Sequence, residues 1–270
     1  MSGHLADFSG DIPLNYDRGL GPILFAGYAE DMANRVASGG AGLRVLETAA
    51  GSGIVTRALR DALPADAHLT ATDLNPGMLA VAREKIRADE AVVFQKADAT
   101  ALPFPDGSFD TMICQFGVMF FPDKDQGHRE AHRVLAAGGR YLFSVWDAHR
   151  HNAFGRITHE VVGSFFPVDP PRFYEVPFSY HLIDPIKESL LAAGFGRIDV
   201  SVVRRGPVVV DFAAFAGGCV FGNPVFDQIR QRGAKPSEVH GAVAEAMREE
   251  FGVEPAVVPL QAIMFEARKA

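Results

Sequence analysis

Three carboxylates and one glycine-rich loop are the residues of this chain whose types and spacing could do chemistry. Glu47 stands shortly before the loop of residues 51–53, and Asp73 and Asp98 each follow a short apolar run further along the chain. Glycines let a ligand lie directly on the backbone, because a Cβ there would collide with it. A helix that begins after such a loop directs free N–H groups at the same place. The combination indicates a site for a nucleotide-like ligand.

The elements that must position these residues alternate in type. Strands are predicted at residues 43–47, 68–73, 92–96, 109–115 and 140–146, and helices at residues 22–37, 54–63, 78–88 and 124–135. Strands that alternate with helices predict an α/β fold, a doubly wound and mostly parallel sheet with right-handed crossovers. Ligands of such sheets bind outside the carboxyl ends of the strands. We therefore expect Glu47, Asp73 and Asp98 to lie along one edge.

The rest of the chain follows a different pattern. Residues 147–180 are rich in His, Phe and Pro, and later segments predict a helix at 184–193, a strand at 196–205, helices over 211–251 with breaks at 217–218 and near 236, and a strand at 257–268. The predicted organisation is an N-terminal helical cap segment (1–42), an α/β core (43–146), a lid insertion (147–183) and a C-terminal part of the core (184–270) that carries a helical insertion (211–251). We expect the cap segment and the two insertions to form a helical lid, which must move for cofactor and product to exchange.

Composition excludes several classes of function. The 270 residues are 48% hydrophobic, which suits one large domain or one domain with a cap. The net charge of −7, without a long basic run, argues against nucleic acid as a partner. Cys114 and Cys219 are far apart and lack the spacing of a metal site, so we expect no metal and a reducing compartment. Neither a leader segment nor a membrane span is evident, so we expect a cytoplasmic protein, and a homodimer is left open.

A dinucleotide site is one interpretation of the loop. Gly51 and Gly53 match the first two positions of the G-x-G-x-x-G fingerprint, and Asp73 lies about 20 residues further on, as the fingerprint requires. Thr56 stands where the third glycine belongs, and the carboxylate of Glu47 would repel a pyrophosphate. A ligand with a ribose and a cationic group but no phosphate suits these charges better. A nicotinamide-dependent oxidoreductase nevertheless stays as an alternative.

The segment Glu-Thr-Ala-Ala-Gly-Ser-Gly, residues 47–53, resembles the first motif of the class I S-adenosylmethionine-dependent methyltransferases. The resemblance continues, in order, through residues 71–79, 97–104, 108–110 and 133–140, and its spacing is that of the branch that includes ubiquinone and menaquinone biosynthesis methyltransferases. One departure is Ala49-Ala50, where relatives often have Gly or Cys. The resemblance implies a Rossmann-like, seven-stranded sheet with residues 257–268 as its antiparallel strand. It also implies S-adenosylmethionine as cofactor and S-adenosylhomocysteine as product.

The same resemblance implies roles for residues that would bind the adenosine half of the cofactor. Asp73 would accept hydrogen bonds from both ribose hydroxyls, because a carboxylate can take two such bonds. Leu74 and Met78 would be apolar walls against adenine. Asp98 would accept from the adenine amino group, and the backbone N–H of Ala99 would meet the ring.

The methionine half would lie over the glycine-rich loop. Ala49 and Gly51 would contact it through backbone groups, with Gly53 completing the floor of the site. Gln115 would lie near the amino-acid moiety or the sulfonium, and Glu47 would order the loop or bind an ammonium group through water.

The acceptor side is less defined. Tyr16 and Phe25 would close over the cofactor, and His149 or His151 would act as a general base if the acceptor keeps its proton at neutral pH. Aromatic residues of the lid favour a small, hydrophobic or aromatic acceptor that is methylated on oxygen, carbon or nitrogen. A non-catalytic protein that binds S-adenosylmethionine is the remaining alternative.

Overall fold

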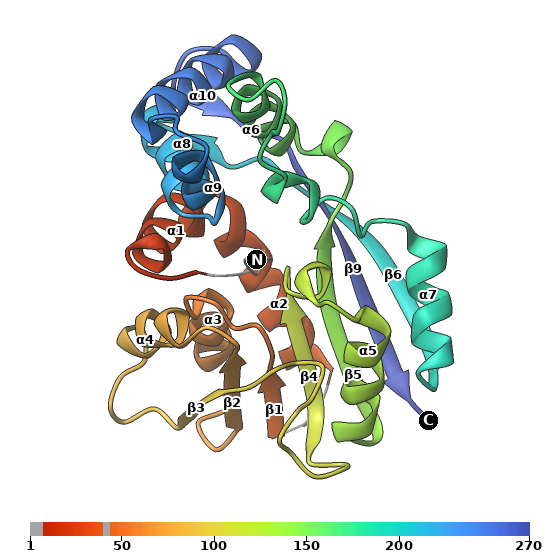
Figure 1. Cartoon of the computed structure of the whole chain (residues 1–270). Helices are drawn as coiled ribbons and strands as arrows, with labels where there is room; N and C mark the ends of the chain where they lie inside the picture. Colours follow the sequence, from red (N-terminus) through yellow and green to blue (C-terminus); the bar gives the residue numbers. More distant parts are fainter. Residues whose placement is uncertain (1–7, 40–43) are drawn as a thin grey trace. The chain divides into compact units, whose positions relative to one another are not determined.

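The computed structural model describes residues 8–39 and 44–270 (Figure 1). Leu43, the first residue of the strand predicted at 43–47, lies outside these residues. The chain divides into two compact units. The sheet unit contains the described residues of Tyr28–Val145, His181–Val203 and Ala262–Ala270, and the helical unit contains those of Met1–Gly27, Trp146–Tyr180 and Arg204–Gln261.

The sheet unit is built on seven strands in the order β3-β2-β1-β4-β5-β9-β6. The strands are β1 (Arg44–Glu47), β2 (His68–Asp73), β3 (Val92–Lys96), β4 (Phe109–Gln115), β5 (Leu135–Trp146), β6 (Phe195–Arg205) and β9 (Leu260–Lys269). Parallel pairing joins β1 to β2 and β4, β2 to β3, and β4 to β5. The arrowhead of β9 in Figure 1 lies at the edge opposite to those of β1, β2 and β4. The predicted seven-stranded, mostly parallel sheet is therefore confirmed.

Helices cover both faces of this sheet. They are α2 (Ala26–Ser38), α3 (Ile54–Ala62), α4 (Pro76–Glu84), η2 (Val118–Phe120), α5 (Lys124–Val134) and α7 (Ile183–Ala192). On one face, Met32 of α2 and Leu59 of α3 pack with strand residues such as Val45 in one buried cluster. Successive strand residues point to opposite faces, so the other face carries an aromatic group in which Tyr141 and Phe143 contact His128 of α5. The fold is thus doubly wound, as predicted.

The helix predicted at 22–37 is part of a longer helical run. A helical run begins with α1 (Ile12–Leu20), continues through the π-helical turn η1 (Gly21–Phe25) and ends with α2. Pro22 lacks an N–H and suggests a helix start. The chain passes through it because the turn widens, with Ala26 N–H donating to the carbonyl of Gly21.

Strand β5 also begins earlier than the predicted start at residue 140. Phe109 of β4 pairs with Leu135, whereas Thr111 pairs with Arg140, so the extra residues bulge out of the ladder. Buried Arg140 then donates from its guanidinium to the carbonyls of Arg35 (2.9 Å) and Val36 (3.3 Å) and pairs with Glu266 (2.9 Å). This side chain satisfies carbonyl groups at the end of α2.

The helical unit contains α1, η1 and later segments of the chain. These are η3 (His149–His151), α6 (Ala153–Ser164), η4 (Phe173–Glu175), β7 (Val208–Val209), α8 (Phe212–Phe221), α9 (Val225–Gln231), α10 (Pro236–Phe251) and β8 (Ala256–Val257). The helices predicted over 211–251 and the break near Pro236 are confirmed. The strand predicted at 257–268 is instead two strands, since β8 pairs with β7 and β9 joins the large sheet.

The predicted break at Gly217-Gly218 is wrong, because α8 runs through both residues. A Cβ built on Gly218 would lie 2.7 Å from the carbonyl carbon of Gly19 in α1, whereas one on Gly217 would meet nothing closer than 3.7 Å. Gly218 therefore allows two helix backbones to approach, and the glycine pair does not end the helix.

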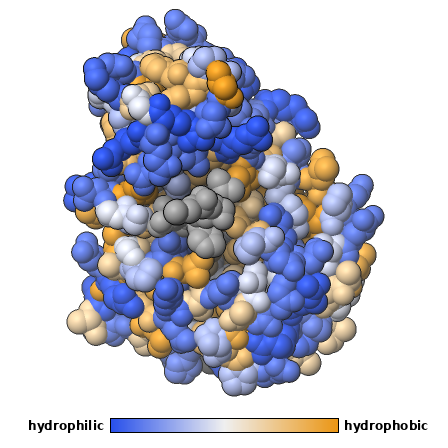
Figure 2. All heavy atoms as spheres, in the orientation of Figure 1, coloured by the Kyte–Doolittle hydropathy of each residue, from blue (hydrophilic) through white to orange (hydrophobic). Residues whose placement is uncertain are grey.

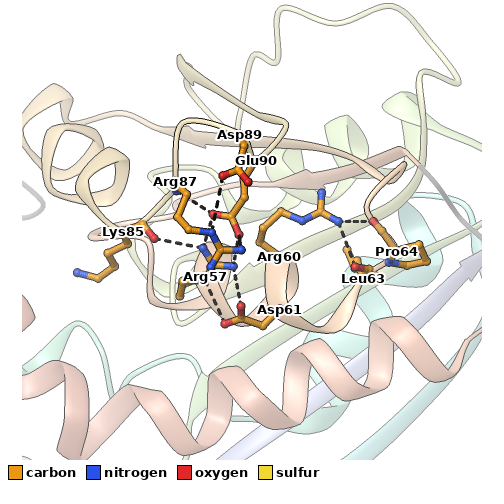
Figure 3. Close-up of polar contacts among 9 residues, drawn as sticks. All are labelled: Arg57, Arg60, Asp61, Leu63, Pro64, Lys85, Arg87, Asp89 and Glu90. Carbon is orange, nitrogen blue, oxygen red and sulfur yellow. Dashed lines mark hydrogen bonds and ion pairs between the residues drawn. The ribbon is translucent and has the colours of Figure 1, made fainter.

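An ion-pair network joins α3 to the turn after α4 (Figure 3). Arg57 binds Glu90 through two nitrogens (2.6 and 2.7 Å) and also binds Asp61 (2.7 Å). Arg87 adds a third bond to Glu90 (2.7 Å). The pairing with Arg57 lowers the pKa of Glu90 to about 2. Nearby, Arg60 donates to backbone carbonyls, Pro64 among them. The network fixes the helices that flank the glycine-rich loop.

Figure 2 shows a mostly hydrophilic face with apolar residues scattered among charged and polar ones. Such scattered residues are normal on a protein surface. Within residues 8–39 and 44–270, no helix is both long and apolar enough to cross a lipid bilayer.

Candidate functional site

The glycine-rich loop is anchored to the two strands that flank β1. Thr48 N–H donates to Ile113 O of β4, and Ala50 N–H donates to Thr72 O of β2, both at 2.9 Å. The loop leaves β1 through left-handed backbone at Ala49 (φ 50°) and Gly51 (φ 57°). These bonds and turns bring the loop across the carboxyl ends of three neighbouring strands.

The two loop glycines serve different purposes. A Cβ on Gly53 (φ 80°) would lie 2.7 Å from the Cβ of Ala82, so this glycine permits the start of α3 to approach α4. A Cβ on Gly51 would meet no atom within 4 Å. The position above Gly51 therefore faces open space, which a side chain would obstruct and a ligand could use.

Asp73 is held beside this loop at the end of β2. Its buried carboxylate accepts Gly51 N–H through Oδ2 and Asn75 N–H through Oδ1, both at 2.8 Å. Burial raises the pKa of Asp73, and the bonds from Asn75 and Gly51 oppose that shift. Asn75 Nδ2 also donates to Oδ1, at 3.4 Å. A carboxylate has about four lone-pair sites, so Oδ2 can accept a further hydrogen bond from a ligand.

Glu47 is buried beneath the loop at the end of β1. Its Oε2 accepts a hydrogen bond from Thr56 Oγ1 at 2.6 Å, and its backbone carbonyl accepts one from Thr72 Oγ1 at 3.0 Å. Burial raises the pKa of Glu47 to about 8; the Thr56 bond opposes this shift and the charge of Asp73 adds to it. Sequence reasoning treated Thr56 only as a departure from a fingerprint. Its position in the first turn of α3, below the loop, was the signal that it could bind the strand-end acid.

Asp98 follows β3 and lies at the same edge of the sheet. Its Oδ1 accepts both the N–H (2.8 Å) and the hydroxyl (2.7 Å) of Thr100. Ala97 N–H donates to the carbonyl of Asp73 (3.1 Å), which ties the segment after β3 to the end of β2. Asp98 is exposed, whereas Ala99 beside it is buried. Thr100 therefore orients the side chain of Asp98, whose carboxylate remains exposed to solvent.

Leu74 and Met78 follow Asp73 on the same side. Leu74 is 49% exposed, and Met78 in the first turn of α4 is buried. Met78 is thus part of the packing around α4, while Leu74 offers apolar surface next to Asp73.

The end of β4 completes this edge. Gln115 is the last residue of β4 and is half-buried. Phe116 follows in left-handed backbone (φ 54°), with its N–H donating to Ser144 O (3.0 Å) and its ring packed edge-on against Tyr28 (5.3 Å). Non-glycine residues in this conformation are uncommon and cluster at functional sites. The sequence carried no signal for Phe116.

Two of the predicted cofactor residues belong to the helical unit. Tyr16 and Phe25 stack on each other there, with ring centroids 5.0 Å apart, and Phe25 also contacts Trp146. Their role over the cofactor stays a prediction.

The two predicted bases also belong to the helical unit and differ in environment. His149 Nε2 lies 3.1 Å from the carbonyl of Tyr174, so this nitrogen carries the proton, and burial lowers the pKa of His149. Its ring packs against Phe178 at 4.5 Å. His151 Nε2 instead accepts a hydrogen bond from Arg150 (3.0 Å). A catalytic role for either residue stays a prediction.

The charges of the sheet edge distinguish among cofactors. Glu47, Asp73 and Asp98 end or follow β1, β2 and β3, which are neighbours in the sheet. The carboxylates of Asp73 and Asp98, joined by that of Glu47 when it ionises, would repel a pyrophosphate there and would attract ribose hydroxyls and a cationic group. The open space above Gly51 leaves room for such a ligand to lie on the backbone of the loop. In the described part of the chain, His, Cys, Asp and Glu form no group of three that could hold a metal ion.

A Rossmann-like sheet with this loop and these acids defines a protein that binds a nucleoside. A family model described as a methyltransferase domain matches residues 46–143. The ubiquinone/menaquinone biosynthesis C-methyltransferase UbiE of Laribacter hongkongensis is 31% identical over 180 residues, which cover 63% of this chain and 73% of that protein. The demethylmenaquinone methyltransferase of Thermus thermophilus is 37% identical over 144 residues, which cover 47% of this chain and 65% of that protein.

The solved structure of phosphoethanolamine N-methyltransferase 2 of Haemonchus contortus in complex with S-adenosyl-L-methionine shares the fold. Its TM-score is 0.60 at 18% identity, and the match covers 95% of this chain and 56% of that one. The present chain belongs to the class I S-adenosylmethionine-dependent methyltransferases, in the branch that resembles UbiE. It is an enzyme whose cofactor is S-adenosylmethionine, and the nicotinamide alternative is set aside.

Proposed function

We propose that this methyltransferase acts on a small hydrophobic or aromatic molecule and that a ring carbon is the acceptor atom. The observation that carries the proposal is the sequence similarity to an enzyme named as a ubiquinone/menaquinone biosynthesis C-methyltransferase and to one named as a demethylmenaquinone methyltransferase. The net charge of −7 fits an uncharged small molecule better than a nucleic acid. A quinol-like ring is the acceptor class that these relatives suggest.

The adenosine half of the cofactor is proposed to bind at the ends of β2 and β3. Asp73 would bind the ribose hydroxyls, a role supported by its fixed orientation and by the further hydrogen bond that Oδ2 can accept. The exposed face of Leu74 would cover adenine, with Met78 behind it. Asp98 and the backbone N–H of Ala99 would read the polar edge of the base.

The methionine half is proposed to lie over the glycine-rich loop. The open space above Gly51 supports this placement, and backbone groups of Ala49 and Gly51 would contact the carboxylate end. Glu47 would act by holding the loop through Thr56, and its ionised form would favour the cationic ligand. Gln115 would orient the amino-acid end.

The sulfonium of the bound cofactor supplies an electrophilic methyl group. The work left to the protein is to exclude water and to align the acceptor in line with that methyl. His149 is the better candidate of the two predicted bases. Its Nε2–H is held by Tyr174 O, which leaves a lone pair at Nδ1, and burial keeps the ring neutral. A base would remove the proton that a phenol-type ring must lose.

Transfer of a labelled methyl group tests the proposed acceptor. The enzyme is incubated with methyl-labelled S-adenosylmethionine and, separately, with a soluble naphthoquinol, a catechol and a primary amine. Label in a C–C bond of the naphthoquinol supports the proposal. Label only on oxygen of the catechol or on nitrogen of the amine contradicts it. Asp73→Ala is the control for product that forms without the cofactor site.

A further inference from the structure

Ala49 is a non-glycine residue at a position where the cofactor loop turns through left-handed backbone. Among residues 8–39 and 44–270, only Ala49 (φ 50°) and Phe116 (φ 54°) combine a side chain with this conformation. They follow β1 and β4, which are paired neighbours in the sheet. Such backbone persists only where the surroundings enforce it, so something must hold Ala49 in place.

Gly117 supplies the space that Ala49 needs. The backbone of Gly117 (φ −102°, ψ −39°) is one that any residue adopts, so backbone conformation does not require glycine there. A Cβ on Gly117 would instead lie 2.5 Å from the Cβ of Ala49 and 2.7 Å from Sγ of Cys114. The missing side chain is therefore matched to the methyl group of Ala49 and to the buried thiol beneath it.

We propose that Gly117 is a positioning residue for S-adenosylmethionine, because it leaves the space in which the methyl group of Ala49 seats the glycine-rich loop. The loop is fixed to the same strand by the bond from Thr48 N–H to Ile113 O, so Gly117 and β4 together form its seat. A side chain at 117 would push Ala49 away and displace Gly51, whose N–H binds Asp73 at 2.8 Å. This inference rests on the proposed cofactor site.

A double-mutant cycle separates the contact with Ala49 from the contact with Cys114. All variants carry Cys114→Ala, which removes the thiol, and binding of S-adenosylhomocysteine is measured by titration calorimetry. Gly117→Ala is expected to weaken binding by about tenfold, the effect of one added methyl group in a packed site. Adding Ala49→Gly is expected to restore affinity to within about threefold of Ala49→Gly alone, because the overlap is then gone.

Gly139→Ala is the matched control for a general loss of stability. A Cβ there would lie 2.8 Å from the carbonyl oxygen of Ala136, at the start of β5 and the opposite edge of the sheet. This variant is expected to lower the melting temperature and to leave the Kd for S-adenosylhomocysteine within about twofold of its parent. An equal rise in Kd in Gly139→Ala would mean that the loss of affinity at Gly117 is only structural, and would overturn the proposal.

The remaining outcomes also decide the question. If Gly117→Ala binds as tightly as its parent, or if Ala49→Gly does not restore binding, the inference is wrong while the cofactor site stands. If Gly117→Ala does not fold, recovery of folding and binding with Ala49→Gly supports the inference, and failure to recover overturns it. If the unmodified enzyme gives no heat with S-adenosylhomocysteine, the proposed site and the inference both fail.

Discussion

Thr56 Oγ1 donates a 2.6 Å hydrogen bond to the buried carboxyl group of Glu47. The bond joins the end of β1 to the first turn of α3 and passes below the glycine-rich loop. A third glycine at position 56, as in a dinucleotide fingerprint, could not make it. The same residue that weakens a dinucleotide interpretation is therefore the partner of the acid at the end of β1.

Glu47→Gln is expected to remove a pH dependence of stability. The pKa of Glu47 is raised from its ordinary 4.5 to about 8, mainly by burial. The folded protein then binds more protons than the unfolded chain, so the contribution of Glu47 is complete below about pH 4.5 and is lost as pH rises through about 8. Between these values the free energy of unfolding should fall with pH at up to about 1.4 kcal/mol per unit relative to the variant.

Urea unfolding of the cofactor-free protein at pH 5, 6, 7 and 8 measures this difference. All other titrating groups are shared, so the wild type minus Glu47→Gln isolates the one carboxyl group. Glutamine keeps an oxygen that can accept the hydrogen bond from Thr56, so the substitution changes the charge and keeps this contact. Parallel stability profiles for the two proteins would show that Glu47 ionises normally.

Cofactor binding is expected to release a proton from Glu47. A cationic ligand over the loop stabilises the carboxylate and lowers its pKa from about 8. At pH 7.5 the binding enthalpy of S-adenosylmethionine should therefore vary with the ionisation enthalpy of the buffer. Titrations in phosphate and in Tris measure the number of protons, and Glu47→Gln should abolish the difference. Equal enthalpies in both buffers for the wild type would contradict the placement of the cationic end near Glu47.

Asp73→Asn is expected to weaken S-adenosylhomocysteine binding by about 100-fold. Hydrogen bonds to a charged acceptor are strong, and the variant loses that charge. The amide of asparagine would also direct N–H groups at a place where Gly51 N–H already donates. Asp110→Asn is the control. Asp110 pairs with Arg44 (2.5 Å) where β4 begins, at the edge away from the loop. Its loss should leave the Kd unchanged. Comparable losses in both variants, measured by calorimetry, would argue against a ribose role for Asp73.

Adjacent glycines of α8 are expected to respond oppositely to alanine. Gly218→Ala places a methyl group 2.7 Å from the backbone of Gly19 and should destabilise the protein by about 1–3 kcal/mol. Gly217→Ala has its nearest neighbour at 3.7 Å and should stabilise by up to about 1 kcal/mol through helix propensity. Urea unfolding measures both. Equal effects would mean that α1 and α8 do not cross closely at these residues.

Strand and helix positions in the cofactor-binding half followed from the sequence because local signals agree with the tertiary fold. β2, β3 and β4 have the predicted bounds, since each is a short apolar run, and an acid ends β2 and follows β3. The predictions failed where a distant contact overrides a local signal. Gly218 predicts a break in a helix, but it allows α8 to cross α1 closely. Pro22 predicts the start of a helix, but it lies inside a continuous helical run.

The sequence by itself determined the cofactor class and predicted the edge of the sheet at which it binds, because residue type, order and spacing decide which groups meet at the ends of parallel strands. Only the tertiary structure decided how the loop is held. Two contacts that hold it join residues of different elements: the bond between Glu47 and Thr56 and the fit of Ala49 to Gly117. The left-handed backbone of Phe116 is a third feature that the packing of the chain sets. Their distances depend on how the chain packs, and no local pattern specifies them.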